Sequence, residues 1–193
     1  MNRRTFLATP LAALVPAAAA GQAAPAAVET SVRSSFDPWI EVHAANLVHN
    51  ASEVNLFSKR PVMAVIKNNG YGLGVVNVAR TLANHPAIAG FAVVKVQEAV
   101  TLRDQGITKP ILLMAPVDDA DLRMVAARNI MPMIYTPVGD VLQREADRLG
   151  RAIPIHVCVD TGIGRVGVPH AVAAPLISDL ARRQGIRIDG TMM

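Results

Sequence analysis

Short continuous apolar runs alternate along the chain with stretches whose apolar residues recur at helical spacing. The runs are typical of strands buried on both faces, and the longer stretches are typical of amphipathic helices. We expect strands at residues 62–66, 90–94, 111–114, 130–135, 153–159 and 186–193, with a further short strand at residues 39–42. We expect helices at residues 42–57, 75–83, 96–104, 119–128, 138–149 and 172–184.

Repetition of strand and helix at this pitch predicts an α/β fold with parallel strands joined by helical crossovers. A doubly wound sheet and a barrel both fit the pattern, because periodicity alone does not separate them. The chain stops inside or just after its sixth strand, whereas a (β/α)8 barrel continues beyond that point. We therefore expect about six parallel strand–helix units and a sequence that is cut off.

The first residues have the pattern of an export signal. Arg3 and Arg4 precede an apolar run, and the small residues at 18–20 suit a signal peptidase. The run is too short, and too interrupted by proline, to form a stable membrane anchor. We predict a signal peptide and linker over residues 1–24 and a folded domain over residues 25–193. A frayed, alanine-rich N-terminus is the structural alternative.

The route and destination of export also follow from this segment. Arg3-Arg4 followed by Phe6-Leu7 resembles a twin-arginine signal, which carries proteins that are already folded. Paired arginines also occur in ordinary secretory signals. By either route, we expect the protein in the periplasm.

The composition of the chain argues against several classes of function and of site. The chain of 193 residues is 51% hydrophobic, enough for a real core. Its net charge is +4, of which Arg3 and Arg4 supply two, so the rest is too weakly basic to indicate nucleic-acid binding. Cys158 is the single cysteine, which excludes an intrachain disulfide and a multi-cysteine zinc site. We expect no metal centre.

A first candidate for chemistry is the segment at residues 64–74, AVIKNNGYGLG. Lys67 stands at the carboxyl end of a buried strand, where parallel α/β proteins build their active sites. A partly desolvated lysine there can act as an amine nucleophile, and Tyr71 offers a hydroxyl nearby. The structural alternative is a solvated lysine beside glycines that only make a turn.

A second candidate is the segment at residues 156–168, HVCVDTGIGRVGV. A strand ends there in a turn with three glycines and Arg165. The planar fork of an arginine binds a carboxylate or a phosphate well. The structural alternative is a helix-entry turn in which Arg165 pairs with a surface acid.

Together these segments resemble the alanine racemase family, pyridoxal-phosphate enzymes of fold type III. The string at residues 65–74 resembles the family's cofactor-lysine motif, and residues 159–168 resemble its second signature. Further matches are Trp39, Glu41, Val42 and Asn50 in the opening pattern, and Glu98-Ala99, Leu102-Arg103 and Gly106 later in the chain. The resemblance covers nearly everything after Phe36.

The resemblance implies a fold and a set of site residues. It implies an incomplete TIM-type (β/α)8 barrel, the N-terminal barrel portion only, without the family's C-terminal β domain. Lys67 would form the internal aldimine with pyridoxal 5'-phosphate and act as one of two bases at the substrate Cα. Tyr71 would donate to the cofactor phosphate, and Arg165 would hold the carboxylate of a small amino-acid substrate. The family forms homodimers.

Two departures from the family pattern bear on substrate choice. Cys158 stands where many alanine racemases have a carbamylated lysine that orients the arginine, and Leu73 replaces the usual histidine. With the export signal, these changes resemble the periplasmic broad-specificity amino-acid racemases more than the alanine-specific ones.

The sequence therefore predicts a pyridoxal-phosphate-dependent amino-acid racemase, of alanine or broad specificity, that interconverts L- and D-amino acids. The family's opposite-face tyrosine lies in a later part of its sequence, and neither Tyr71 nor Tyr135 matches its motif. We therefore expect this chain alone to be inactive. The alternative is a non-catalytic pyridoxal-phosphate-binding barrel or the fragment of a pseudogene.

Overall fold

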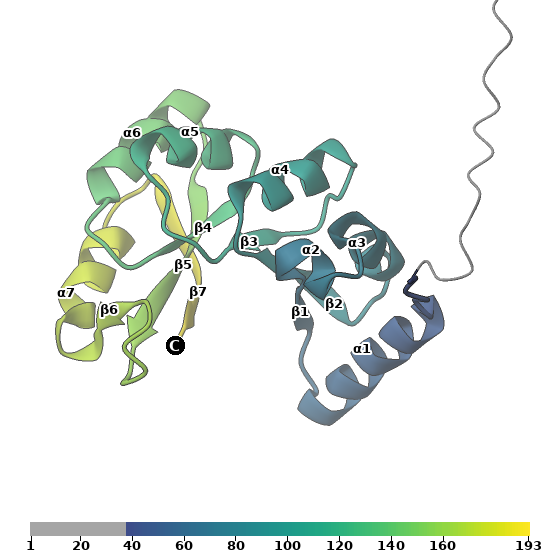
Figure 1. The fold of residues 1–193 in the computed structure, drawn as a ribbon. Helices are drawn as coiled ribbons and strands as arrows, with labels where there is room; N and C mark the ends of the chain where they lie inside the picture. Colours follow the sequence, from purple (N-terminus) through teal and green to yellow (C-terminus); the bar gives the residue numbers. More distant parts are fainter. Residues whose placement is uncertain (1–37) are drawn as a thin grey trace, which may run out of the picture. The chain divides into compact units, whose positions relative to one another are not determined.

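Helices and strands alternate along residues 38–193, which are the residues described by the computed structural model (Figure 1). The signal peptide predicted for residues 1–24 lies outside them. The strands are β1 (Val62–Val65), β2 (Ile88–Val93), β3 (Ile111–Leu113), β4 (Met131–Ile134), β5 (Ile153–Asp160), β6 (Val168–Pro169) and β7 (Ile186–Met192). The helices are α1 (Ala44–Ser58), α2 (Lys67–Tyr71), α3 (Val75–Ala83), α4 (Val96–Asp104), α5 (Asp119–Ala127), α6 (Gly139–Leu149) and α7 (His170–Ala181).

The strands form one sheet in which every pairing is parallel. The order is β1-β2-β3-β4-β5, and β7 continues the sheet beside β5. The two-residue β6 pairs with the end of β5 at Val159 and Asp160. Parallel neighbours need a crossover, which the helices supply. The prediction of about six parallel strand–helix units is confirmed, and β6 is an addition that the hydrophobic pattern did not indicate.

The helices pack against one face of this sheet only. Two apolar clusters join strands to helices: one contains Phe91 and Leu102, and the other contains Ile155 and Leu180. A third cluster lies on the other face and is made of strand and strand-end residues alone: Ala92, Leu112, Met131, Met133 and Cys158, flanked by Met63, Met114, Tyr135 and Met192. A doubly wound sheet carries helices on both faces, whereas a barrel carries them outside. The fold is therefore an incomplete TIM-type barrel.

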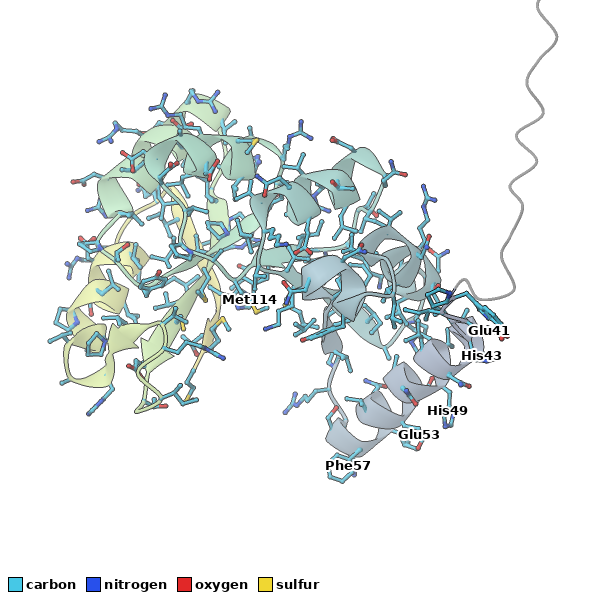
Figure 2. The ribbon with its side chains drawn as sticks, viewed as in Figure 1. Glu41, His43, His49, Glu53, Phe57 and Met114 are labelled. Atoms are coloured by element: carbon cyan, nitrogen blue, oxygen red, sulfur yellow. The ribbon has the colours of Figure 1, made fainter. Side chains whose placement is uncertain are left out.

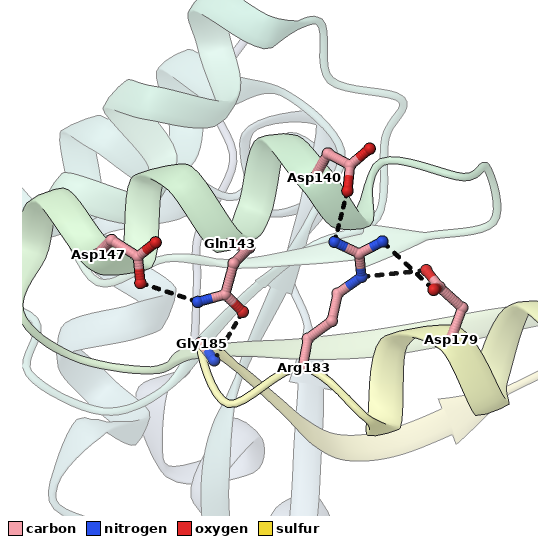
Figure 3. Close-up of polar contacts among 6 residues, drawn as sticks. All are labelled: Asp140, Gln143, Asp147, Asp179, Arg183 and Gly185. Carbon is pink, nitrogen blue, oxygen red and sulfur yellow. Dashed lines mark hydrogen bonds and ion pairs between the residues drawn. The ribbon is translucent and has the colours of Figure 1, made fainter.

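A polar clamp fixes α6 against α7 and the turn before β7 (Figure 3). The Arg183 guanidinium donates to Asp140 on α6 at 2.6 Å and to Asp179 on α7 at 3.1 Å. Gln143 accepts from the backbone N–H of Gly185 at 3.0 Å. These contacts set where the chain re-enters the sheet as β7.

The beginning of the described chain differs from the prediction. Residues 39–42 were expected as a strand, but they form neither strand nor helix, and α1 begins at Ala44. Trp39 and Ile40 are exposed, and within residues 38–193 the segment pairs with no strand. An apolar alternation cannot make a strand without a neighbouring strand to bond.

Only a narrow stripe of side chains on the helix α1 is buried. Ala51 is its one fully buried residue, whereas Phe57 is 92% exposed and points away from the sheet in Figure 2.

Among the helices of residues 38–193, none combines the length and the apolar character needed to cross a membrane.

Candidate functional site

Lys67 lies two residues after the end of β1, at the carboxyl edge of the sheet. Ile66, the residue before it, is buried and its N–H donates to the carbonyl of Ala92 on β2 at 2.9 Å. Lys67 itself is only partly buried. Within the described chain, no hydrogen bond or ion pair to its amine is formed. The lysine therefore presents a free amine at the edge where barrels of this class place their active sites.

The residues after Lys67 form a left-handed turn. The φ angles of Asn68, Asn69, Gly70 and Tyr71 are 52°, 55°, 63° and 56°. Left-handed backbone is costly for residues other than glycine, and asparagine tolerates it best. The sequence predicted a tight turn from its glycines, but consecutive left-handed residues were not foreseen.

Hydrogen bonds within the segment hold this turn closed. The N–H of Gly70 donates to the Ile66 carbonyl at 2.9 Å, and that of Gly74 donates to the Asn69 carbonyl at 2.8 Å. The Asn69 side-chain oxygen accepts from the N–H of Val75, at the start of α3, at 3.0 Å. A Cβ at Gly70 would lie 3.2 Å from Val78 Cγ2, so the turn also packs tightly on α3.

A buried carboxylate contacts the same turn from the neighbouring strand–helix unit. Glu98 in the first turn of α4 is 9% exposed, and its Oε1 accepts from the Asn69 N–H at 2.7 Å. Its Oε2 finds no partner among the described residues. From the sequence, Glu98 was only a match to the family pattern and had no predicted role. Nothing in the local pattern indicates its contact with Asn69, which lies 29 positions away.

Tyr71 closes the turn that Lys67 opens. Its side chain is 62% exposed, so its hydroxyl is accessible from solvent. The structure therefore brings Lys67 and Tyr71 together in one short element, α2. Both belong to the first of the two candidate segments.

The second candidate segment is a loop fixed by Asp160 at the end of β5. Asp160 Oδ1 accepts from the N–H groups of Gly162 at 2.9 Å and Gly164 at 3.0 Å. The hydrogen bond from Gly164, and then that from Gly162, lower the pKa of the Asp160 carboxyl. Gly167 passes so close that a Cβ there would lie 2.6 Å from the Asp160 nitrogen. The loop thus needs both the carboxylate and the glycines.

Arg165 lies on this loop and is exposed. Cys158 is buried in the cluster on the face of the sheet that carries no helices, which we call the concave face. It lines a small cavity with Arg165 and Val166. Burial raises the pKa of the Cys158 thiol, and the positive charge of Arg165 lowers it to a smaller extent. The thiol is therefore neutral at pH 7 and gives Arg165 no anionic partner.

The two segments share the carboxyl edge of the sheet but do not touch. In the sheet order, β2, β3 and β4 lie between the turn after Lys67 and the loop of Arg165. Within residues 38–193, no hydrogen bond joins Arg165 to Lys67 or Tyr71. A cavity of about 190 Å³ lies between them in strand order, at the ends of β3 and β4, lined in part by Pro116 and Tyr135. None of its lining residues belongs to either segment, and Leu122 and Ile134 place it on the helix-covered face of the sheet.

The amine, hydroxyl and guanidinium groups of the two segments suit an organic ligand. Across residues 38–193, no cluster of three or more histidine, cysteine or carboxylate side chains is placed to hold a metal ion. The groups that do face the edge are an amine, a phenol hydroxyl and a guanidinium, which suit an aldehyde, a phosphate and a carboxylate respectively.

Comparison with known proteins gives one consistent result. The family described as "Alanine racemase, N-terminal domain" matches residues 42–193. The alanine racemase of Symbiobacterium thermophilum is 37% identical over 154 residues, which are 79% of this chain and 41% of that protein. That of Aquifex pyrophilus is 33% identical over 133 residues, 69% of this chain and 38% of that protein. The chain thus spans about two fifths of the length of the curated relatives that it matches.

Solved structures agree with the sequence matches. An alanine racemase of Clostridium difficile in complex with cycloserine superposes with a TM-score of 0.67 at 27% identity, over 77% of this chain and 40% of that one. The alanine racemase of Corynebacterium glutamicum gives 0.68 at 28% identity, over 77% and 43%.

Proposed function

Because the chain belongs to the alanine racemase family, whose N-terminal domain it matches over residues 42–193, we propose that it is the lysine-bearing part of an amino-acid racemase. The family depends on pyridoxal 5'-phosphate. The observation that carries the proposal is the free amine of Lys67 at the carboxyl edge, followed by a fixed left-handed turn.

The residues present fit this cofactor. Lys67 supplies an accessible amine for its aldehyde, and the exposed Tyr71 hydroxyl supplies a donor for its phosphate. Both come from a five-residue element tied to β2, α3 and α4, so they keep a fixed mutual direction. We propose that Lys67 and Tyr71 hold pyridoxal phosphate at this edge.

The chemistry divides between cofactor and protein. Bound pyridoxal phosphate supplies an electron sink that stabilises negative charge at the substrate Cα. Lys67 moves a proton at that carbon on one face, and Arg165 binds the substrate carboxylate through its planar fork. The Arg165 guanidinium thereby fixes which substituents of the amino acid point toward Lys67.

The surroundings of Arg165 favour a broad substrate range. The neutral, buried Cys158 gives the guanidinium no charged partner that would fix its direction. An arginine held less firmly can follow carboxylates of differently sized amino acids. We propose a small amino acid as the substrate class, with alanine as one member of a wider set.

Racemisation needs a proton-transfer group on each face of the substrate Cα, because one base tends to return the proton to its own side. Lys67 serves one face. We propose that the group for the other face is not supplied by these 193 residues, so this chain alone binds the cofactor without turnover. The span of about two fifths of the relatives' length supports this division.

The test uses the full 193-residue chain mixed with pyridoxal phosphate. We expect a visible absorbance band in the parent, its loss in Lys67→Ala, and its retention in Lys95→Ala. Lys95 is a matched control because it is an exposed lysine that follows the neighbouring strand, β2, at the same edge. A band that survives Lys67→Ala would remove the basis of the proposal.

A separate assay tests the division between binding and turnover. The purified chain is incubated with L-alanine and pyridoxal phosphate, and D-alanine is measured. We expect bound cofactor without D-alanine. Turnover comparable to that of an intact relative would contradict the proposal that the second proton-transfer group lies elsewhere.

A further inference from the structure

The turn after Lys67 is energetically unfavourable by itself. Asn68, Asn69 and Tyr71 all have left-handed backbone angles, each of which costs roughly 1 kcal/mol or more for a residue with a side chain. Such a conformation persists only where neighbouring groups hold it. The direction in which Lys67 leaves β1 therefore depends on the contacts that the turn makes.

Most of these contacts join the turn to residues that follow it along the chain. Asn69 accepts from Val75 through its side chain and from Gly74 through its carbonyl, which secures the turn to α3. The contact of Glu98 with the Asn69 N–H is different, because it comes from α4 and not from the turn itself or from α3. It ties the lysine turn sideways to the next strand–helix unit.

The environment of Glu98 is unfavourable for a residue that serves stability alone. Its carboxyl is 9% exposed, and one of its two oxygens has no partner among the described residues. A buried carboxylate with an unsatisfied oxygen costs free energy, although its place in the first turn of α4 offsets part of that cost. A buried, half-satisfied polar group calls for an explanation beyond packing.

We propose that Glu98 is a positioning residue that holds the Asn69 amide and thereby sets the direction of the Lys67 amine. The proposal rests on the proposed role of Lys67. Glu98 acts through the turn and does not itself touch the cofactor. What matters is an acceptor oxygen at the Asn69 N–H, so a glutamine at position 98 can replace the glutamate and a shorter side chain cannot.

The experiment compares variants of the full chain loaded with pyridoxal phosphate. We measure cofactor affinity by visible absorbance and cofactor orientation by visible circular dichroism per bound cofactor. Glu98→Ala is expected to weaken affinity about tenfold and to lose most of the circular dichroism, since one hydrogen bond to a buried acceptor is lost. Glu98→Gln is expected to keep both within about twofold.

A matched control separates positioning from stability. Glu145 on α6 is also a buried carboxylate, 8% exposed, and it pairs with Arg148. Glu145→Ala is expected to lower the unfolding temperature while leaving the visible circular dichroism per bound cofactor unchanged. A loss of that signal in Glu145→Ala equal to the loss in Glu98→Ala would overturn the positioning role.

If Glu98→Ala does not fold, Glu98→Asp gives the decisive comparison. Aspartate keeps the charge but is one methylene too short to reach the Asn69 amide, so it is expected to lose orientation as alanine does. Normal affinity and circular dichroism in Glu98→Asp overturn the proposal. Failure of the proposed function would look different, because the parent chain itself would then form no adduct at Lys67.

Discussion

His156 places an imidazole on the concave face of the sheet. Its strand neighbours Ile155 and Val157 face the helices, so His156 faces the other way, toward Gly190 on β7. A Cβ at Gly190 would lie 2.7 Å from His156 Cε1, which shows how closely β7 covers the ring. Burial lowers the pKa of His156, and the nearby Asp189 carboxylate opposes this to a smaller extent.

This lowered pKa predicts acid sensitivity of the fold. Between the lowered pKa and the ordinary value near 6.5, the unfolded chain binds the proton more readily than the folded chain. The His156 contribution to stability is therefore complete above about pH 6.5 and falls as the pH falls through that window. His156→Gln is expected to lower this pH dependence, measured as urea midpoints between about pH 7 and pH 5. Parallel pH profiles for parent and variant would contradict the assignment.

Among individual residues, the sequence indicated some members of the candidate site and missed others. Lys67 and Tyr71 could be predicted because both belong to one contiguous string at a strand end. Asn69 was part of that string, but its role depends on a backbone angle that residue type does not dictate. Glu98 could not be given a role, because its hydrogen bond joins two units separated in sequence and only the folded sheet brings them together.

Among the elements, α6 and α7 are joined by an arginine that lies over a glycine. A Cβ at Gly139 would come within 2.5 Å of Arg183 Nε and 2.8 Å of Asp179 Oδ2. Arg183 cannot move aside freely, because Asp140 and Asp179 hold its guanidinium. The absence of a side chain at Gly139 is thus a condition for the clamp between the two helices.

A double-mutant cycle tests this dependence. Gly139→Ala is expected to destabilise the parent by about 1–2 kcal/mol, because the methyl group displaces the clamp. In an Arg183→Ala background the same change is expected to be neutral or to stabilise by up to about 1 kcal/mol, since alanine favours a helix over glycine. Urea unfolding measures all four chains. Equal effects of Gly139→Ala in both backgrounds would show that Arg183 is not the cause.

The strands and long helices were predictable to within a few residues, because each carries its own hydrophobic period. The strand expected at residues 39–42 was wrong, since the same alternation has no neighbouring strand in the described chain. The short α2 and β6 could not be predicted. The first is a left-handed turn without a hydrophobic period, and the second is two residues defined only by pairing with β5.

For the whole molecule, the choice between barrel and doubly wound sheet needed the structure. Strand and helix lengths fit both architectures, but helices on one face only fit the barrel. The concave face carries methionine, alanine and leucine side chains, residues that a local pattern does not distinguish from a helix-facing core.

Export of the protein to the periplasm is predicted from its N-terminal segment. Residues 1–37 fused to a reporter enzyme are expected to carry it into the periplasm of a bacterial host. Exchange of both Arg3→Lys and Arg4→Lys is expected to block this, because a twin-arginine route requires arginine where ordinary secretion requires only positive charge. Cell fractionation measures both fusions. Cytoplasmic retention of the parent fusion contradicts export, and export of the lysine variant contradicts the route.

Covalent trapping tests whether Lys67 carries the cofactor. The full chain is incubated with pyridoxal phosphate, reduced with borohydride and digested, and the modified peptide is identified by mass spectrometry. The chain has three other lysines, Lys59, Lys95 and Lys109, as internal competitors. We predict the modification at Lys67 and its loss in Lys67→Ala. Modification spread over the other lysines, or none at all, would contradict the assignment of Lys67 as the cofactor lysine.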